Sequence, residues 1–145
     1  MRAYSFHGIV GREATVRAAA ATQESALVEK LRFGLAFVAL SDELITRLAP
    51  GGDSVGPPFI EFVRLNKSVV EWAQEASSRG PVGYIEGEFA DGAGFHAAVA
   101  WRDGKMVYGP QHREEREPVN AVLRLLGVVP EAGMDEMDTV GLADR

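Results

Sequence analysis

Apolar and polar side chains alternate with a period of two residues through the segment from Val82 to Tyr108. This period is typical of β-strands, whose successive side chains point to opposite faces of a sheet. Aspartate and glycine interrupt the alternation at Asp91-Gly92 and at Asp103-Gly104, where short turns are expected. The pattern therefore predicts a three-stranded antiparallel β-meander over residues 82–109.

The loop between the first two strands decides which side chains share a face, because a shift of one residue moves a whole strand pattern to the other face. A two-residue loop, Asp91-Gly92, would place Glu86 and Glu88 among the apolar side chains of the second strand. Burying unpaired carboxylates costs several kcal/mol, so we expect a three-residue loop over 92–94 instead. The residues then expected in the core are Ile85, Phe89, Phe95, Val99 and Trp101.

The second turn has the composition of a primed two-residue turn. It is predicted to pair Trp101 with Met106 and Val99 with Tyr108, so that the meander has one continuous apolar face.

The first half of the chain contains further predicted elements. The apolar run 3–10 is predicted to be a strand that leads into an alanine-rich helix. The runs on either side of Arg32-Phe33-Gly34 predict a hairpin, and Ser41 is expected to cap a brief helix that ends at Pro50. The run 59–63 is interpreted either as a strand or as an apolar lead-in to the next helix.

Two segments show the period of an amphipathic helix. Over 66–79, apolar residues recur at the spacing i, i+3, i+4, i+7, and Ser68 with Glu71 fits a capping box. Over 118–126 the same spacing recurs, with Pro118 in the first turn. Both helices are expected to cover the apolar face of the meander. The fold class predicted is α+β, with a mainly antiparallel sheet of five or six strands.

The chain is expected to fold as one domain over 1–129, followed by an acidic tail over 130–145. Few apolar groups in this tail are available to offset the entropy of ordering it. Its sizeable apolar side chains are Met134, Met137, Val140 and Leu142. We expect them to dock either on a second copy of the chain, which would give a homodimer, or on the polar face of the sheet.

Composition narrows the classes of function. The 145 residues carry a net charge of −6, which disfavours nucleic acid as a partner. Cysteine is absent, which excludes disulfides and thiolate metal sites. The sequence also lacks an export signal and a run of roughly 20 apolar residues that would cross a membrane. We therefore expect a cytoplasmic protein with no membrane association, no metal and no cofactor.

The polar face of the predicted meander is the candidate binding face. Its side chains are Tyr84, Glu86, Glu88, His96 and Arg102. One interpretation is a merely solvated sheet face. Another is a pocket for a small ligand or a protein partner, with a floor of small side chains at Ala98 and Ala100. A third makes His96 a general base oriented by Glu88, with Glu86 as a second acid. This enzymatic interpretation lacks a nucleophile and an oxyanion donor, so no catalytic residue is assigned.

Weaker candidates lie elsewhere. Gly8 and Gly11 precede a helix and would present amides to an anion beside Arg12, without the full glycine fingerprint of a dinucleotide site. His112 and Glu115 have ligand-like spacing, but a single pair supplies too few ligands for zinc. His7 is interpreted as a structural histidine.

Four segments carry a resemblance to known proteins: GPVGYIEGEF, GFHAAVAWRDGKMVYGP, NAVLRLLGV and LAFVALSDEL. They resemble a family of small uncharacterised actinobacterial proteins, over about half of the chain. The resemblance implies a bacterial origin and a shared fold.

The size, acidity and α+β pattern are also similar to those of immunity proteins that neutralise toxins. We therefore expect a non-enzymatic binding or regulatory protein, in particular an immunity-like inhibitor of another bacterial protein. The alternative is a small-molecule-binding protein or an enzyme that uses a Glu/His pair on the polar sheet face.

Overall fold

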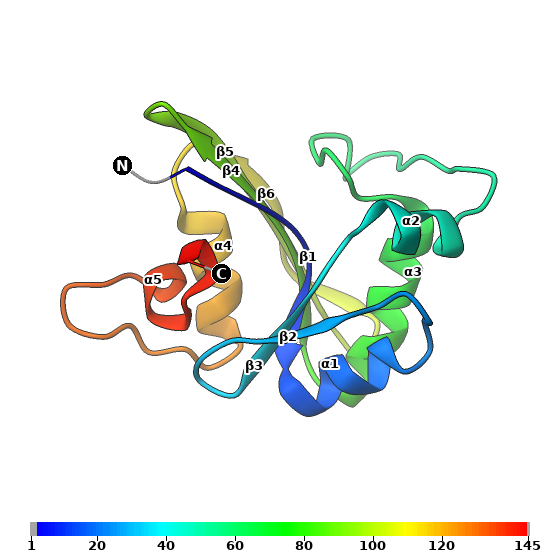
Figure 1. Cartoon of the computed structure of the whole chain (residues 1–145), viewed down its shortest axis with the longest axis horizontal. Coiled ribbons are helices and arrows are strands. Elements are labelled where there is room, and N and C mark those ends of the chain that lie inside the picture. Colours follow the sequence, from blue (N-terminus) through cyan, green and yellow to red (C-terminus); the bar gives the residue numbers. More distant parts are fainter. Residues whose placement is uncertain (1–2, 145) are drawn as a thin grey trace.

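The computed structural model describes residues 3–144, and it has one six-stranded antiparallel sheet with helices on both faces (Figure 1). The strand order is β2-β3-β1-β4-β5-β6. The strands are β1 (Tyr4–Arg12), β2 (Val28–Lys30), β3 (Leu35–Ala39), β4 (Val82–Ala90), β5 (Ala93–Arg102) and β6 (Lys105–Arg113). The helices are α1 (Glu13–Ala20), α2 (Asp42–Leu48), α3 (Lys67–Ala76), α4 (Glu117–Leu125) and α5 (Glu136–Val140), with 3-10 turns η1 (Ser77–Arg79) and η2 (Leu142–Asp144). The predicted α+β class is confirmed.

The sheet separates two apolar cores. We call the face covered by α1, α2 and α3 the α3 face, and the face covered by α4, α5 and η2 the α4 face (Figure 1). Large buried side chains on the α3 face are Ile9, Leu44, Trp72, Tyr84 and Trp101. Those on the α4 face are Phe6, Phe37, Ile85, Leu123 and Met137. The central strands are therefore buried on both sides.

The two amphipathic helices form close to the predicted positions but lie on opposite faces. The sequence analysis expected both of them to cover Ile85 and Val99 together, yet these two residues point to opposite sides of the sheet. Pairing explains the difference, because Tyr84 rather than Ile85 is opposite Val99.

The helix N-termini are fixed by side-chain caps. The hydroxyl of Ser41 accepts the N–H of Leu44 at 3.1 Å, as predicted. The cap of α3 is Asn66, whose Oδ1 accepts the N–H of Val69 at 2.8 Å. The capping box predicted at Ser68 is not formed, because the Ser68 hydroxyl donates instead to Asp53 at 2.7 Å.

The β4–β5 hairpin has the two-residue turn that the sequence analysis rejected. Ala90 pairs with Ala93, so the turn consists of Asp91 and Gly92, and both have positive φ angles of 54° and 79°. These angles are those of a primed turn, whose twist suits a hairpin. The three-residue loop over 92–94 is therefore wrong, and the faces of β5 are reversed relative to β4. Trp101 is fully buried as predicted.

The β5–β6 turn is predicted correctly, but the ladder beyond it shifts. Asp103 and Gly104 have positive φ angles, and Trp101 pairs with Met106. Irregularities in the ladder then place Ala100, rather than Val99, opposite Tyr108.

The segment after Val129 packs on its own chain. Met137, Val140 and Leu142 are buried with Phe6 and other side chains of the α4 face. These residues thus complete the second core, whereas the sequence analysis expected docking on a second copy or on a polar sheet face.

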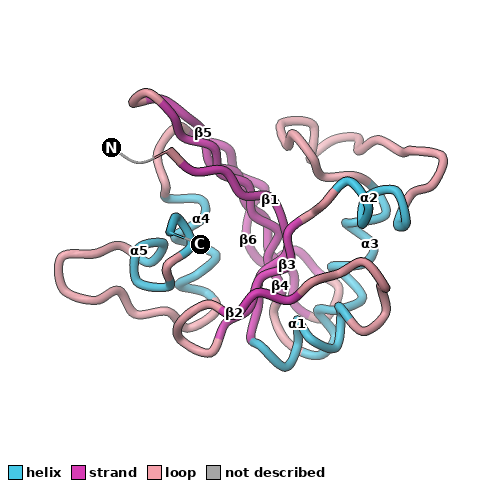
Figure 2. The backbone as a smooth tube through the Cα atoms, viewed as in Figure 1, coloured by secondary structure: helices cyan, strands magenta, loops and turns pink. Residues whose placement is uncertain are grey.

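The long connection between α2 and α3 lies on the α3 face (Figure 2). Residues 59–63, for which the sequence left open a strand or a lead-in, form turns. Phe62 is buried in the core of this face, while Ile60 and Val63 are 68% and 62% exposed.

Candidate functional site

The structure separates the five residues of the predicted binding face. Tyr84, Glu86 and Glu88 point to the α3 face, because they alternate along β4 with Ile85 of the α4 face. His96 is opposite Gly87 and lies on the α4 face. The proximity of His96 to Glu88 on one face, which the enzymatic interpretation needs, is therefore wrong.

Glu86 is fully buried and is bound within the chain. Its carboxylate accepts the N–H of Val63 at 2.7 Å, the N–H of Arg64 at 2.8 Å and the hydroxyl of Tyr84 at 2.6 Å. Burial and the nearby carboxylate of Glu86 raise the pKa of Tyr84 well above its ordinary value. Glu86 thus anchors the loop that contains Val63 to the middle of the sheet.

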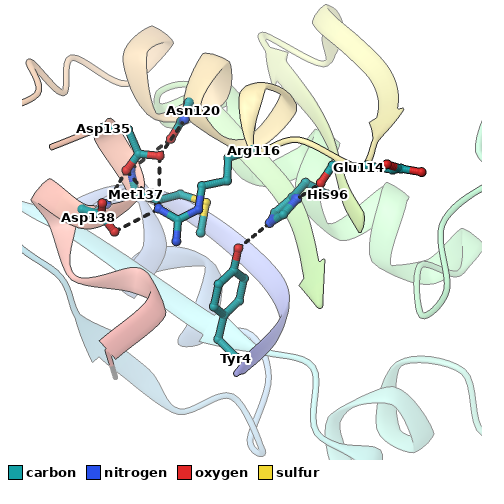
Figure 3. A network of polar contacts seen from close by, with 8 residues as sticks. All are labelled: Tyr4, His96, Glu114, Arg116, Asn120, Asp135, Met137 and Asp138. Atoms are coloured by element: carbon teal, nitrogen blue, oxygen red, sulfur yellow. Dashed lines mark hydrogen bonds and ion pairs between the residues drawn. The ribbon is translucent and has the colours of Figure 1, made fainter. Parts of the chain in front are cut away.

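His96 is buried on the opposite face and has partners for both ring nitrogens. Its Nδ1 lies 2.9 Å from the carbonyl oxygen of Glu114, and its Nε2 lies 2.7 Å from the hydroxyl of Tyr4 (Figure 3). A carbonyl only accepts, so Nδ1 carries the hydrogen, and in the neutral ring Nε2 accepts from Tyr4. Burial lowers the pKa of His96, and the charge of Arg116 lowers it further.

Arg116 extends this network toward the C-terminal segment. Its guanidinium lies 5.4 Å from the centre of the Tyr4 ring, and Nη1 is bound to Asp135 at 3.2 Å and to Asp138 at 2.9 Å (Figure 3). Burial alone would raise the pKa of Asp135, but the N–H of Asp138, Asn120 and Arg116 together lower it. These charges are paired with one another and link α5 to β1.

A shallow groove lies on the α3 face at the end of the sheet that carries the β4–β5 turn. It has a volume of about 540 Å³. Its lining residues are Ala3, Tyr4, Ser5, Glu88, Phe89, Ala90, Ala93, Gly94 and Phe95. Small side chains form most of this lining, and Glu88 is its one charged member among the described residues. We refer to this feature as the Glu88 groove.

Two histidines lie beside the Glu88 groove. Nε2 of His7 is 2.8 Å from Oε2 of Glu88, whose side chain is 43% exposed. The ring of His112 stacks on Phe95 with centroids 5.3 Å apart, and its Nδ1 is 3.8 Å from Oε2 of Glu61. The predicted Glu/His pair is thus replaced by His7 and Glu88.

The pairing of His7 with Glu88 is not visible in the sequence, because the two residues are far apart in the chain. Pairing of β1 with β4 places Ser5 opposite Glu88 and His7 one step further along the same face. The predicted strand over 3–10 is consistent with Ser5 and His7 on one face, but no local pattern identifies β4 as the neighbouring strand.

The remaining candidates gain no support as sites. Arg102 is exposed beside the β5–β6 turn, at the end of β5 away from the groove. The N–H of Glu13, the first amide of α1, donates to the carbonyl of Gly34 at 2.9 Å. This amide is therefore not free to bind an anion beside Arg12. Within residues 3–144, no group of three or more His, Asp or Glu side chains is arranged to hold a metal ion.

Comparison with protein-family models, with curated proteins and with solved structures found no match to this chain. Among the described residues, no helix has both the length and the apolar composition needed to cross a membrane.

Proposed function

We propose that this chain is a non-enzymatic binding protein, acting in the cytoplasm in the manner of an immunity protein, that regulates a protein partner through the Glu88 groove. The observation that carries the proposal is the contrast between the interior and this surface. The buried ionisable groups of the described residues all have hydrogen-bond partners within the chain, and they are Tyr84, Glu86, His96 and Glu136. The groove, in contrast, is open, and its Glu88 carboxylate is 43% exposed although it also contacts His7.

The groove is continuous with apolar side chains that an interface would use. Phe95 lines the groove and stacks on His112, which lies beside Glu61 of the 59–63 turns. Val63 of the same turns is exposed, although its backbone is held by Glu86. A rigid backbone that presents apolar and aromatic groups costs little entropy on binding, and such groups dominate the energy of protein interfaces.

Site-specific photo-crosslinking tests the proposal. The photoreactive residue p-benzoylphenylalanine replaces Ala93, an exposed residue in the lining of the groove. In a control chain it replaces Glu71 on the exposed side of α3. We expect a protein cross-linked from position 93 and not from position 71. The cross-linked protein is identified, purified and titrated with the unmodified chain by calorimetry. Cross-links that form equally from position 71, or a purified partner that does not bind, would refute the proposal.

An enzyme is the second candidate, because Nε2 of His7 lies within hydrogen-bond distance of Glu88. Ser5 is on the same face, opposite Glu88, and is exposed. Among the described residues, however, Ser5 has no hydrogen bond to His7, which a serine nucleophile activated by histidine requires. Hydrolysis of p-nitrophenyl acetate distinguishes the two functions. A binding protein should react at the same rate with and without Glu88→Gln, whereas an enzyme should lose activity in that variant.

A further inference from the structure

The first residues of β1 form an open sheet edge. β3 ends at Ala39, opposite Gly8, and the chain then leaves the sheet toward α2. The N–H of Leu40 still donates to the carbonyl of His7 at 2.8 Å. Nearer the N-terminus, Tyr4, Ser5 and Phe6 pair with β4, and among the described residues no strand pairs with them on the other side.

The hydrogen bond from Leu40 to His7 shows in which direction the peptide groups of β1 point. Because the carbonyl of His7 points away from β4, and peptide groups alternate along a strand, the N–H and C=O of Ser5 point the same way. Ser5 is exposed. Its backbone therefore offers one donor and one acceptor to a further strand, as the edges that bind extended peptides do.

The side chains beside this edge define the charge of the occupant. Ser5 is directly opposite Glu88, and its short side chain leaves Glu88 accessible across β1. The described lining of the Glu88 groove contains no lysine or arginine, and the whole chain carries a net charge of −6. A long cationic side chain on an added strand would cross Ser5 and meet the Glu88 carboxylate.

From these observations we propose that the outer edge of β1 at Ser5 binds an extended segment of the partner protein as an additional strand, with an arginine or lysine of that segment bound to Glu88. This inference rests on the proposed function, and it names the chemistry of the partner. A second copy of the chain is a poorer occupant, because pairing β1 with β1 would bring two Glu88 carboxylates to the same edge.

Two peptides test the proposal directly. The first is acetyl-Thr-Val-Arg-Val-Thr-amide, in which arginine and the two valines point to opposite faces of an extended chain. The second has glutamate in place of arginine. In an NMR titration of the labelled protein, the arginine peptide should shift the amides of Ser5 to His7 and of Glu88 to Phe95. The glutamate peptide should bind more weakly by about tenfold or more, as expected for the loss of one charge-assisted hydrogen bond.

Variants of the protein separate the two parts of the site. Glu88→Gln should weaken binding of the arginine peptide by about tenfold. Its affinity for the glutamate peptide should be unchanged or higher. Ser5→Pro removes the outward N–H and should weaken both peptides. If Ser5→Pro does not fold, Ser5→Arg is used instead. The guanidinium introduced at position 5 would form an ion pair with the Glu88 carboxylate and so compete with the arginine peptide. Glu71→Gln on α3 is the matched control and should change neither affinity.

Several results would overturn this inference. They are no binding of the arginine peptide, shifts confined to another surface, equal binding of both peptides by the wild-type chain, or a dimer in sedimentation that dissociates in the Ser5 variant. These results are distinguishable from failure of the proposed function. A partner that is cross-linked from position 93 would still support the proposed function, even if the peptides do not bind at β1.

Discussion

The backbone N–H of Met137 donates to the side-chain carbonyl of Asn120 at 3.0 Å, and it joins the start of α5 to the middle of α4 (Figure 3). The amide of Asn120 in turn donates to Asp135 at 3.0 Å. One asparagine side chain thus holds both the cap and the first turn of α5. The C-terminal segment is therefore positioned by directional bonds as well as by apolar contacts.

Met137→Ala should lower the free energy of unfolding by about 2–5 kcal/mol, because its buried side chain leaves a cavity in the core of the α4 face. Met134 in the preceding loop is 45% exposed, and Met134→Ala should change stability by less than about 0.5 kcal/mol. Urea denaturation of the two variants measures both values. Equal small effects would mean that α5 does not contribute to the folded core.

Glu86→Gln should destabilise the protein by about 3 kcal/mol, since the amide group of glutamine would face backbone N–H donors that the carboxylate now satisfies. Glu75→Gln, at an exposed position of α3, is the matched control and should be nearly neutral. Chemical denaturation compares the two. A Glu86→Gln variant as stable as its control would show that the carboxylate is not required to hold Val63 and Arg64.

Gly87→Ala should destabilise the protein by about 1–3 kcal/mol, because a Cβ at this position would lie 2.4 Å from the Phe6 ring, which is itself buried. Gly56→Ala is a control in an exposed loop, where an added Cβ meets no atom within 4 Å. Thermal melts of both proteins test the difference. A melting temperature that is unchanged in Gly87→Ala would refute the close packing of Phe6 on β4.

Stability should also depend on the protonation of His96. Its pKa is lowered in the folded state, chiefly by burial, so the folded protein prefers the neutral ring. The charged groups that face it are Arg116, whose charge also lowers this pKa, and Asp135, which opposes that effect. The contribution of His96 is therefore fully present above the unfolded-state histidine pKa of about 6.5, and it is lost as the pH falls from there through the lowered pKa of the folded state.

His96→Gln isolates this effect, because glutamine retains one donor and one acceptor but does not titrate. The wild-type protein should lose more free energy of unfolding between pH 7.5 and pH 5.5 than the variant does. The other histidines are common to both proteins and cancel in the comparison. An identical pH dependence of the two proteins would contradict the predicted role of His96.

Periodicity located most of the elements, but it predicted neither the faces of the sheet nor helix α5, which lies in the expected acidic tail. The spacing in 66–79 and in 118–126 located α3 and α4, and Ser41 marked the start of α2. The error at the β4–β5 turn arose from the assumption that a buried Glu86 would be unpaired. Two of its three partners are the backbone amides of Val63 and Arg64, which no side-chain pattern reveals, and only the Tyr84 hydroxyl lies on the same strand.

The Glu88 groove was only partly predictable for a related reason. Glu88 was included in the candidate face, but His7 and Ser5 reach it through the pairing of β1 with β4. This contact is non-local, and hydrophobic periodicity contains no information on which strands are neighbours. The glycines of β4 did carry a usable signal. Gly83 and Gly87 lie on the α4 face, where an added Cβ would collide with Val122 and Phe6, so two glycines spaced by four residues in a strand indicate a crowded face.

The shifted ladder of β6 also affects how the sheet behaves at high protein concentration. A long free edge strand invites further strands and leads to aggregation. In β6 the pairing is irregular near Ala100, and Pro110 lacks the N–H that an added strand would need. At the other edge, β2 has only three residues. Both outer strands are thus poor templates for growth of the sheet, and we expect Pro110→Val to make the protein more prone to form fibrils than the wild type.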